Sequence, residues 1–422
     1  MATFHVDPDF VEQLAATLRA GNWVRLALKS RVWFTFPDDR ALTAKVVGQV
    51  WEHFGGSRPS LKQLTKFLKK AISALPHEPE QRAVPVEPAP MTARWPVPVL
   101  ATPVQLAHWL NVPLTRLEWL ADIKEWTLRQ ADAKLRHYVN VWVPRRRGKP
   151  RLLEAPKPHL KAIQRRILHE ILDHIPPHDT AHGFRTGRSI VSYARPHVGK
   201  QMVLHFDLRD FFASVSAARV RAIFRTAGYP ADVASLLTGL CTTRTPDDVT
   251  VAGIHWRRRH LPQGAPTSPA FANLAARRMD VRLSALAEKL GATYTRYADD
   301  LAISGGHDLE RAVRRVNVLV GIIAGEEGFE LNFRKTRFMR QSVCQQVAGV
   351  VVNVKTNCRR EDFDRLKAIL HNCARHGPAC QNRERHPDFR RHLLGRVAHL
   401  RHLNPARGAR LQALFEHIDW TR

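Results

Sequence analysis

Residues 295–304, TRYADDLAIS, set two aspartates between two short runs of strand-forming residues. Such runs around a brief interruption predict a strand, a tight turn and a second strand. Adjacent carboxylates repel each other, so an ordinary exposed turn gives no reason to keep both Asp299 and Asp300. A turn with one capping aspartate is the simplest alternative. If both are functional, they need a cation to neutralise them.

A second acidic position follows another predicted strand, in residues 202–212, MVLHFDLRDFF, where an apolar run ends on Asp207. If the two segments are neighbours in one sheet, Asp207 and Asp299 project from adjacent strand ends. Hard oxygen ligands select Mg²⁺. Two such ions about 3.5–4 Å apart are a known arrangement for in-line phosphoryl displacement. We therefore expect Asp207, Asp299 and Asp300 to hold two Mg²⁺ ions.

The composition points to a polyanionic partner. The 422 residues suggest two or three domains, and 66 Lys and Arg against 38 Asp and Glu give a net charge of +28. Such an excess is typical of proteins that bind nucleic acid, although a merely basic or ribosome-associated protein is an alternative. The five cysteines form no CxxC pair, which fits a reduced, cytoplasmic setting. No leader and no membrane-spanning run is visible, so we expect no membrane contact.

Periodicity and proline content divide the chain. Helical spacing of apolar residues predicts a small helical unit over 1–76, with Ser60 as a helix N-cap. Residues 77–103 are rich in proline and predict a semi-rigid linker. Farther on, Val139–Val143 and Leu152–Leu153 flank a turn and predict a hairpin with a basic tip. The tip is either a phosphate contact or an ordinary solvated face.

Two further segments suggest substrate contacts. In residues 261–274, LPQGAPTSPAFANL, a turn leads into a helix that begins near Ser268, so backbone amides and Gln263 can face a substrate. In residues 328–338, GFELNFRKTRF, Lys335 is placed to reach a phosphate or donate a proton.

Cys373 and Cys380 lie among histidines, but their spacing matches no familiar zinc pattern.

The order of these segments resembles the reverse transcriptases. FDLRDFF, LPQGAPTSP, YADD, GFELNFRKT and QVAGVVVN follow one another as the palm motifs of that family do, and the resemblance runs from about residue 103 to 422. It implies an α+β right-hand polymerase fold with fingers, a palm built on an antiparallel sheet, and a helical thumb. The implied domains are N-terminal helices and fingers over 104–200, palm over 201–354 and thumb over 355–422, behind the N-terminal helical extension.

The resemblance also implies roles for individual residues. Asp207, Asp299 and Asp300 match the carboxylates that bind the catalytic metal ions, and Lys335 matches the proposed proton donor to pyrophosphate. The family synthesises DNA on an RNA template from dNTPs.

Four further positions match the family's nucleotide site. Phe212 corresponds to the bulky side chain under the sugar that excludes a 2′-hydroxyl, and Gln263 to a residue near the incoming nucleotide. Arg151 corresponds to a fingers cation that grips the triphosphate, with Arg145 or Arg146 as a looser second. All four are expectations from the resemblance alone.

Within that family the chain resembles the bacterial retron enzymes. Residues 181–200, AHGFRTGRSIVSYARPHVGK, resemble the retron block where Asn-Ala-x-x-His is expected, but Tyr193 replaces the Asn. Ala348 stands where Val-Thr-Gly has its Thr. Both departures concern RNA recognition and leave the polymerase motifs intact. A retron enzyme copies a partner structured noncoding RNA into a short DNA, and the RNA–DNA hybrid serves antiphage defence, which suggests an effector protein as a further partner.

Two other functions stay open. One is a different bacterial reverse transcriptase, either defence-associated or related to group II introns. The other is a palm protein that binds RNA without catalysis, although the intact aspartates oppose it.

The last part of the chain is basic and helical. Apolar residues at helical spacing form one stripe, while Arg390, Arg391, Arg396 and Arg401 supply cations. RNA helices are bound mainly through shape and phosphates, so these four arginines are expected to bind RNA. A dimerisation bundle is the alternative.

Overall fold

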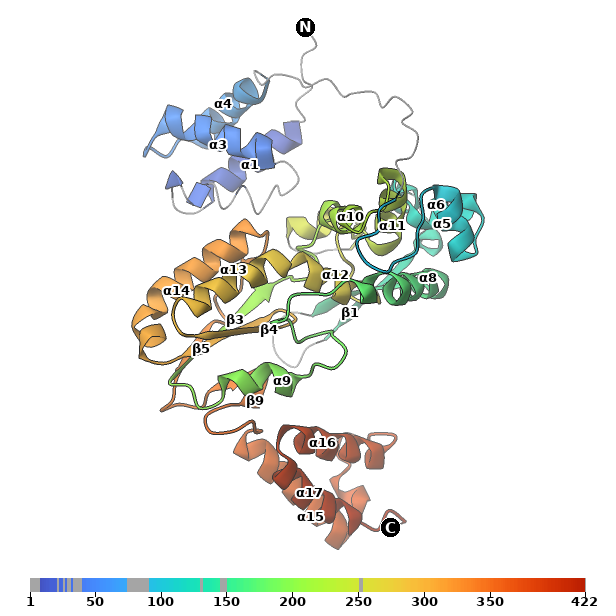
Figure 1. Cartoon of the computed structure of the whole chain (residues 1–422), viewed down its shortest axis with the longest axis vertical. Coiled ribbons are helices and arrows are strands. Elements are labelled where there is room, and N and C mark those ends of the chain that lie inside the picture. The colour runs from blue at the N-terminus through green and yellow to red at the C-terminus, as the bar shows by residue number, and fades with distance from the viewer. Residues whose placement is uncertain are drawn as a thin grey trace. The chain divides into compact units, whose positions relative to one another are not determined.

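A computed structural model describes residues 8–20, 23–25, 27–28, 32, 40–73, 91–129, 132–144, 150–249 and 253–421 (Figure 1). It is of the α+β class, as expected, with α-helices and antiparallel strand pairs. The chain divides into two units. The first comprises Met1–His178, Arg209–Met279 and Leu319–Leu331, and the second Asp179–Leu208, Asp280–Val318 and Asn332–Arg422. Within the described ranges, none of the helices combines the length and apolar character needed to cross a bilayer.

The N-terminal part of the first unit is the predicted helical group. Helices α1 (Pro8–Arg19), α3 (Arg40–Phe54) and α4 (Leu61–Ser73) pack around a core that includes Leu14, Val50 and Leu64. Ser60 caps α4 as predicted: its Oγ accepts the Gln63 backbone N–H, and the Gln63 side chain accepts the N–H of Ser60. Residues 91–102, the described part of the predicted linker, contain no helix or strand.

The rest of the first unit combines short helices with one hairpin. Strands β1 (Tyr138–Val143) and β2 (Arg151–Pro156) pair in antiparallel fashion, which confirms the predicted hairpin. Its tip, residues 145–149, lies outside the described residues. The other elements are α5 (Pro103–Leu110), α6 (Leu114–Ala121), α7 (Trp126–Arg129), η2 (Ala133–Leu135), α8 (Pro158–Glu170), η3 (Leu172–His174), α10 (Ala217–Thr226), α11 (Ala231–Cys241), η5 (Ile254–Arg257), α12 (Ser268–Ala275) and β6 (Glu330–Leu331).

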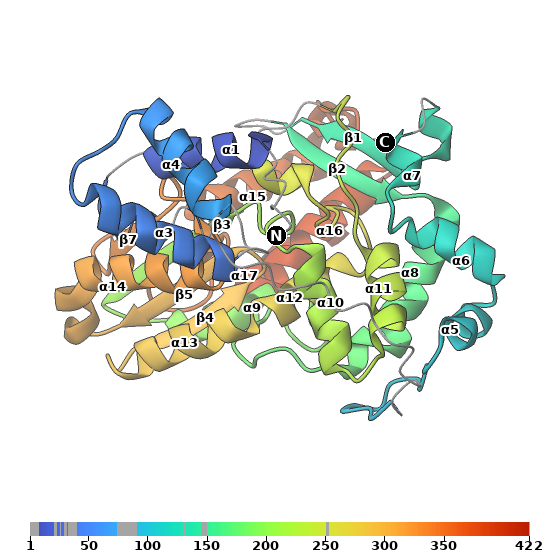
Figure 2. The same ribbon diagram turned by 90° about the horizontal axis from the view of Figure 1, so that it is seen from above.

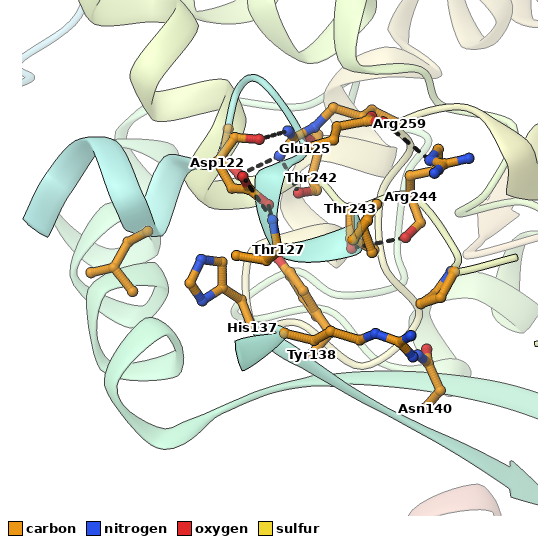
Figure 3. A pocket seen from close by; sticks show the side chains of 15 residues that line it. Asp122, Glu125, Thr127, His137, Tyr138, Asn140, Thr242, Thr243, Arg244 and Arg259 are labelled. Carbon is orange, nitrogen blue, oxygen red and sulfur yellow. Dashed lines mark hydrogen bonds and ion pairs between the residues drawn. The ribbon is translucent and has the colours of Figure 1, made fainter. Parts of the chain in front are cut away.

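Arg259 joins two helix ends in this unit (Figure 3). Its guanidinium donates to the carbonyls of Ala121 and Asp122 at the end of α6, and to those of Gly239 and Thr242 at the end of α11. A helix end leaves its last carbonyls without partners, and the half-buried Arg259 donates to four such carbonyls here. The cavity around Arg259 measures about 30 Å³, so it holds at most a few waters and is structural.

The second unit is built on the strands that carry the acidic motifs. Strands β4 (Thr293–Tyr297), β5 (Asp300–Gly305), β3 (Met202–Arg209) and β7 (Arg337–Arg340) lie in that order, and each neighbouring pair is antiparallel. Helices α13 (Arg277–Glu288) and α14 (His307–Glu326), which both begin or end in the first unit, lie along one face of this sheet, and α9 (Ile190–Ala194) lies on the other (Figure 1). The 3₁₀ helix η4 (Arg195–His197) follows α9, and β8 (Gln346–Val347) and β9 (Val350–Val351) form a small hairpin.

The predicted helices after Asn353 are present. Helices α15 (Arg360–His376), α16 (Phe389–Leu403) and α17 (Pro405–Glu416) pack together (Figure 2), with η6 (Pro378–Gln381) between the first two. Their apolar stripe, which includes Phe363, Leu366 and Leu370, continues into the same core as Val347 and Val350 of the β8–β9 hairpin. These helices are therefore anchored through a shared apolar core.

A fully buried ion pair lies beneath the strands. Arg296 on β4 and Asp280 on α13 both have no exposed side-chain surface, and Arg296 Nε and Nη2 donate to the two Asp280 oxygens at 2.8 and 2.7 Å. The Tyr294 hydroxyl donates to the same carboxylate at 2.8 Å. Such bidentate geometry is needed to offset the cost of burying both charges.

We expect Asp280→Asn to destabilise the protein by about 3–5 kcal/mol, because it leaves the buried guanidinium of Arg296 without a counter-charge. Thermal unfolding measured by circular dichroism checks this. The control is Asp308→Asn, which breaks an exposed ion pair with Arg311 and should leave the melting temperature nearly unchanged. Equal effects of the two substitutions would contradict the assignment of Asp280 as a buried anchor.

Candidate active site

Sheet register brings the three aspartates together. Strands β3 and β5 are antiparallel neighbours, and Asp207 pairs directly with Asp300. The Leu208 N–H donates to the Asp299 carbonyl at 2.9 Å. The expectation that the two acidic segments form adjacent strands is therefore confirmed, and all three residues belong to the second unit.

The turn between β4 and β5 is held in an unfavourable backbone conformation. Ala298 has a φ of +56°, which is uncommon for a residue with a Cβ. Arg296 Nη1 donates to the Ala298 carbonyl at 3.2 Å from within the buried ion pair. Gly183 lies so close that a Cβ there would be 2.5 Å from the Ala298 nitrogen. The turn that presents Asp299 is thus fixed from two sides.

Neighbouring polar groups hold the carboxylates. Lys335 Nζ donates to Asp207 Oδ2 at 2.8 Å, and Asn332 Nδ2 donates to Asp207 Oδ1 at 3.1 Å. His205 Nε2 lies 3.0 Å from Asp300 Oδ1. Both oxygens of Asp207 are therefore engaged, while the Lys335 side chain is half exposed and can move.

The three charges affect one another. The pKa of Asp299 is raised to about 6, first by burial and then by the charges of Asp300 and Asp207. The cavity in which these groups meet measures about 380 Å³. It is lined by His205, Asp207, Asp299, Asp300, Lys335, Arg337, Gln346, Ala348 and Gly349. A divalent cation bound here would relieve the repulsion that raises this pKa.

The donor chemistry suits a hard cation, but the side chains are not yet gathered around one. Among the described residues, no three His, Cys, Asp or Glu side chains form a group that could hold a metal ion as they stand. Asp207 turns both of its oxygens to Lys335 and Asn332. Three carboxylates in one cavity nevertheless provide the oxygen ligands that Mg²⁺ prefers. Movement of the Lys335 side chain alone would free the Oδ2 atom of Asp207.

The predicted nucleotide-site residues lie in the first unit, apart from Arg145, which falls outside the described residues. Phe212 follows β3 and is half-buried, with its ring 5.7 Å from that of Phe211. Arg151 begins β2. The turn of Gln263 is fixed to β2, because its carbonyl accepts the Glu154 N–H at 2.9 Å.

The four predicted RNA-binding arginines differ in how far they are exposed. All four lie on α16, where Arg390, Arg391 and Arg401 are exposed and Arg396 is half-buried. Arg390 and Arg401 are eleven residues apart, about three helical turns, and so share a face. Burial and the nearby charge of Arg365 lower the pKa of Arg396. The sequence alone gave no reason to distinguish these four arginines. In the structure Arg396 differs from the others because it is half-buried.

Residues 181–200, which resemble the retron block, include side chains that pack against strands β4 and β5. His197 has no exposed surface, and its ring nitrogens lie 2.6 Å from Ser304 Oγ and 2.7 Å from Thr295 Oγ1. Burial lowers the pKa of His197 to about 3, so the ring is neutral. Tyr193 is equally buried. In this chain the two residues are part of the interior beside β4 and β5.

Sequence reasoning missed three residues of the site and its support. His205 precedes Asp207 by two residues, and the period of a strand places both on one face, which was a usable signal. Asn332 stands near Lys335 in the same motif. The contact of Asp280 with Arg296 had no signal, because a lone acid on an amphipathic helix reads as a surface residue.

Comparison with known proteins identifies the family of the chain. Residues 143–355 match the family model described as reverse transcriptase (RNA-dependent DNA polymerase). The chain belongs to the retron-type reverse transcriptases. The retron Mx65 reverse transcriptase of Myxococcus xanthus is 42% identical over 326 residues, which cover 76% of this chain and 72% of that protein. The retron Mx162 enzyme of the same organism is 36% identical over 334 residues, covering 75% of this chain and 67% of the relative.

Family membership establishes the class of reaction. The chain is an RNA-directed DNA polymerase, a nucleotidyltransferase that uses an RNA template and dNTPs. Enzymes of this family use divalent metal ions. The retron Ec86 enzyme of Escherichia coli is also similar, at 34% identity over 222 residues, which cover 52% of this chain and 64% of the relative.

We expect Asp299→Asn to stabilise the protein when divalent ions are chelated at pH 8. The folded-state pKa of Asp299 lies above that of an unfolded aspartate, so its ionised form costs folding free energy above about pH 6. The amide removes this cost, and we expect a gain of about 1–3 kcal/mol. The gain should shrink toward pH 4, where the native carboxyl is protonated. Melting curves at several pH values measure it.

The control for this substitution is Asp364→Asn, an exposed position on α15. It removes the same charge and should give no gain at any pH. A lower melting temperature for Asp299→Asn at pH 8 would contradict a net folding cost of the ionised Asp299 carboxylate.

Proposed function

We propose that Asp207, Asp299 and Asp300 hold two Mg²⁺ ions and that the enzyme copies a structured noncoding RNA into a short DNA. The observation that carries this is the meeting of three carboxylates, from the paired strands β3 and β5 and the turn before β5, in one cavity with Lys335. Held by these carboxylates, such ions would supply charge stabilisation to the attacking and leaving oxygens. The relatives are named retron reverse transcriptases. On the resemblance to retron enzymes we include in the proposal a partner RNA, an RNA–DNA hybrid and a role in antiphage defence with an effector protein.

Lys335 has two roles in this proposal. Its ammonium group balances the charge of Asp207 while no substrate is present, as the 2.8 Å contact indicates. Its half-exposed side chain can then turn to the pyrophosphate and donate a proton as the new bond forms. Asn332 keeps Asp207 oriented during this exchange, because its amide contacts the other carboxylate oxygen.

Nucleotide selection is assigned to residues of the first unit. Phe212 excludes the 2′-hydroxyl sterically, Gln263 contacts the incoming nucleotide, and Arg151 with Arg145 grips the triphosphate. A rigid turn supports the role of Gln263. Glu154, which binds its carbonyl, is fully buried and accepts hydrogen bonds from Thr245 at 2.8 Å and His260 at 2.9 Å.

These assignments correspond to the right-hand polymerase fold. We assign the N-terminal helices and the fingers to 104–200, the palm to 201–354 and the thumb to 355–422, where Arg390, Arg391, Arg396 and Arg401 contact RNA phosphates. Residues 1–76 form a helical extension, joined by the linker 77–103. The exposed arginines of α16 and its shared core with the β8–β9 hairpin support the thumb assignment.

Asp299→Asn should abolish dNTP incorporation while RNA binding persists. Loss of a metal ligand removes several kcal/mol of transition-state stabilisation, so the rate should fall about a thousandfold or more. Affinity for RNA depends on the cations elsewhere and should change little. Primer extension and RNA binding by fluorescence anisotropy measure the two effects, with Asp308→Asn as the control. Extension near the natural rate would refute the assignment.

The triple variant Arg390→Gln, Arg391→Gln, Arg401→Gln should bind structured RNA more weakly and with a shallower dependence on salt. Each lost phosphate contact reduces the slope of log affinity against log salt by roughly 0.7–0.9. Glutamine keeps helix propensity, so α16 should still form. Anisotropy titrations at three salt concentrations measure the slope.

The control removes the same charge from α14, through Arg311→Gln, Arg314→Gln and Arg315→Gln, all exposed. Its salt slope should match that of the natural protein. Equal slopes for all three proteins, with a change of oligomeric state in the α16 variant, would indicate a dimerisation helix instead.

A further inference from the structure

The helical group formed by α1, α3 and α4 lies outside residues 143–355, which match the family. Between α3 and α4 it contains an open groove of about 800 Å³. The α3 side is lined by Gln49, Glu52, His53 and Phe54, and the α4 side by Gln63, Lys66, Phe67, Lys70 and Ala71. A groove of this size is not needed to close the core, since the buried apolar residues already form a continuous cluster.

Aromatic rings form one part of the groove. The His53 ring stacks on that of Phe67, with centroids 4.6 Å apart and planes inclined by 21°. Phe54 meets the same Phe67 ring edge-on at 5.3 Å. His53 is exposed and Phe67 is half-buried, so the aromatic cluster reaches the surface. Exposed aromatic rings are the surfaces on which unpaired bases stack.

Two lysines of α4 line the groove beside these rings. Residues 57–73 contain Arg58, Lys62, Lys66, Lys69 and Lys70 and no acid, while Glu52 is the one acid among residues 40–73. Lys66 and Lys70 are one helical turn apart on the groove side of α4 and are exposed. A strip of lysines beside aromatic rings fits a polyanion that also presents flat bases.

We propose that this groove binds a single-stranded segment of RNA, with bases against His53 and Phe67 and phosphates at Lys66 and Lys70. The enzyme already works on RNA, so RNA is the polyanion at hand. Duplex RNA is recognised through shape and phosphates and offers no free base faces, so the aromatic cluster favours a single strand. The proposal does not depend on the Mg²⁺ assignment.

The test crosslinks the full-length protein to a thiouridine-labelled oligouridine and identifies the labelled peptides by mass spectrometry. We expect crosslinks in α3 and α4. In Lys66→Gln, Lys70→Gln their yield should fall about tenfold at physiological salt, as expected for two lost phosphate contacts. The matched control is Lys62→Gln, Lys69→Gln, which removes two lysines from the same helix outside the groove and should keep the yield.

Two further readouts complete the experiment. An excess of RNA duplex should compete poorly for the α3 and α4 crosslinks, while unlabelled oligouridine should remove them. Extension of a short annealed primer should be unchanged in both lysine variants, because neither changes the candidate active site. Three results would each overturn the proposal: no crosslinks in α3 and α4, equal yields in the two variants, or full competition by duplex. If the groove instead binds an acidic protein segment, no crosslinks in α3 and α4 are expected.

Discussion

Repulsion among three carboxylates is the constraint around which the second unit is organised. Asp207 and Asp300 face each other across paired strands, and Asp299 adjoins them at a turn. Burial, and then the charges of Asp300 and Asp207, raise the pKa of Asp299, so the folded chain holds these groups together at a cost in free energy. Lys335, Asn332 and His205 reduce that cost without removing it. A cation bound beside these carboxylates would relieve the remaining repulsion.

Holding repelling groups in place requires a rigid support, and the support here is polar as well as apolar. The Arg296–Asp280 pair fixes β4 to α13 and also binds the carbonyl of Ala298 at the strained turn. His197 bridges β4 and β5 through two hydroxyl groups. Hydrogen bonds have strict geometry, so they fix register where apolar packing alone tolerates slippage. The positions of the three aspartates therefore depend on this buried hydrogen-bond network.

The sequence predicted those features that repeat along the chain. Strand patterns gave the β3 and β5 segments, a spacing of three to four apolar residues gave the last helices, and Ser60 gave a helix start. It could not reveal Asp280 as the partner of Arg296, since periodicity identifies an apolar face and not which charges pair inside it. The same limit applies to Arg396, whose half-burial depends on how α15 and α16 pack.

The acidic cavity also explains why the protein is so basic elsewhere. Three carboxylates repel a nucleic-acid backbone, so the residues proposed for the chemistry cannot supply affinity for the template. Affinity must come from cations on other surfaces, where a contact with phosphate does not disturb the metal ligands. Arg390, Arg391 and Arg401 of α16 and the lysines of α4 are exposed and satisfy this requirement. A net charge of +28 fits the proposal that an acidic catalytic centre acts on a polyanion.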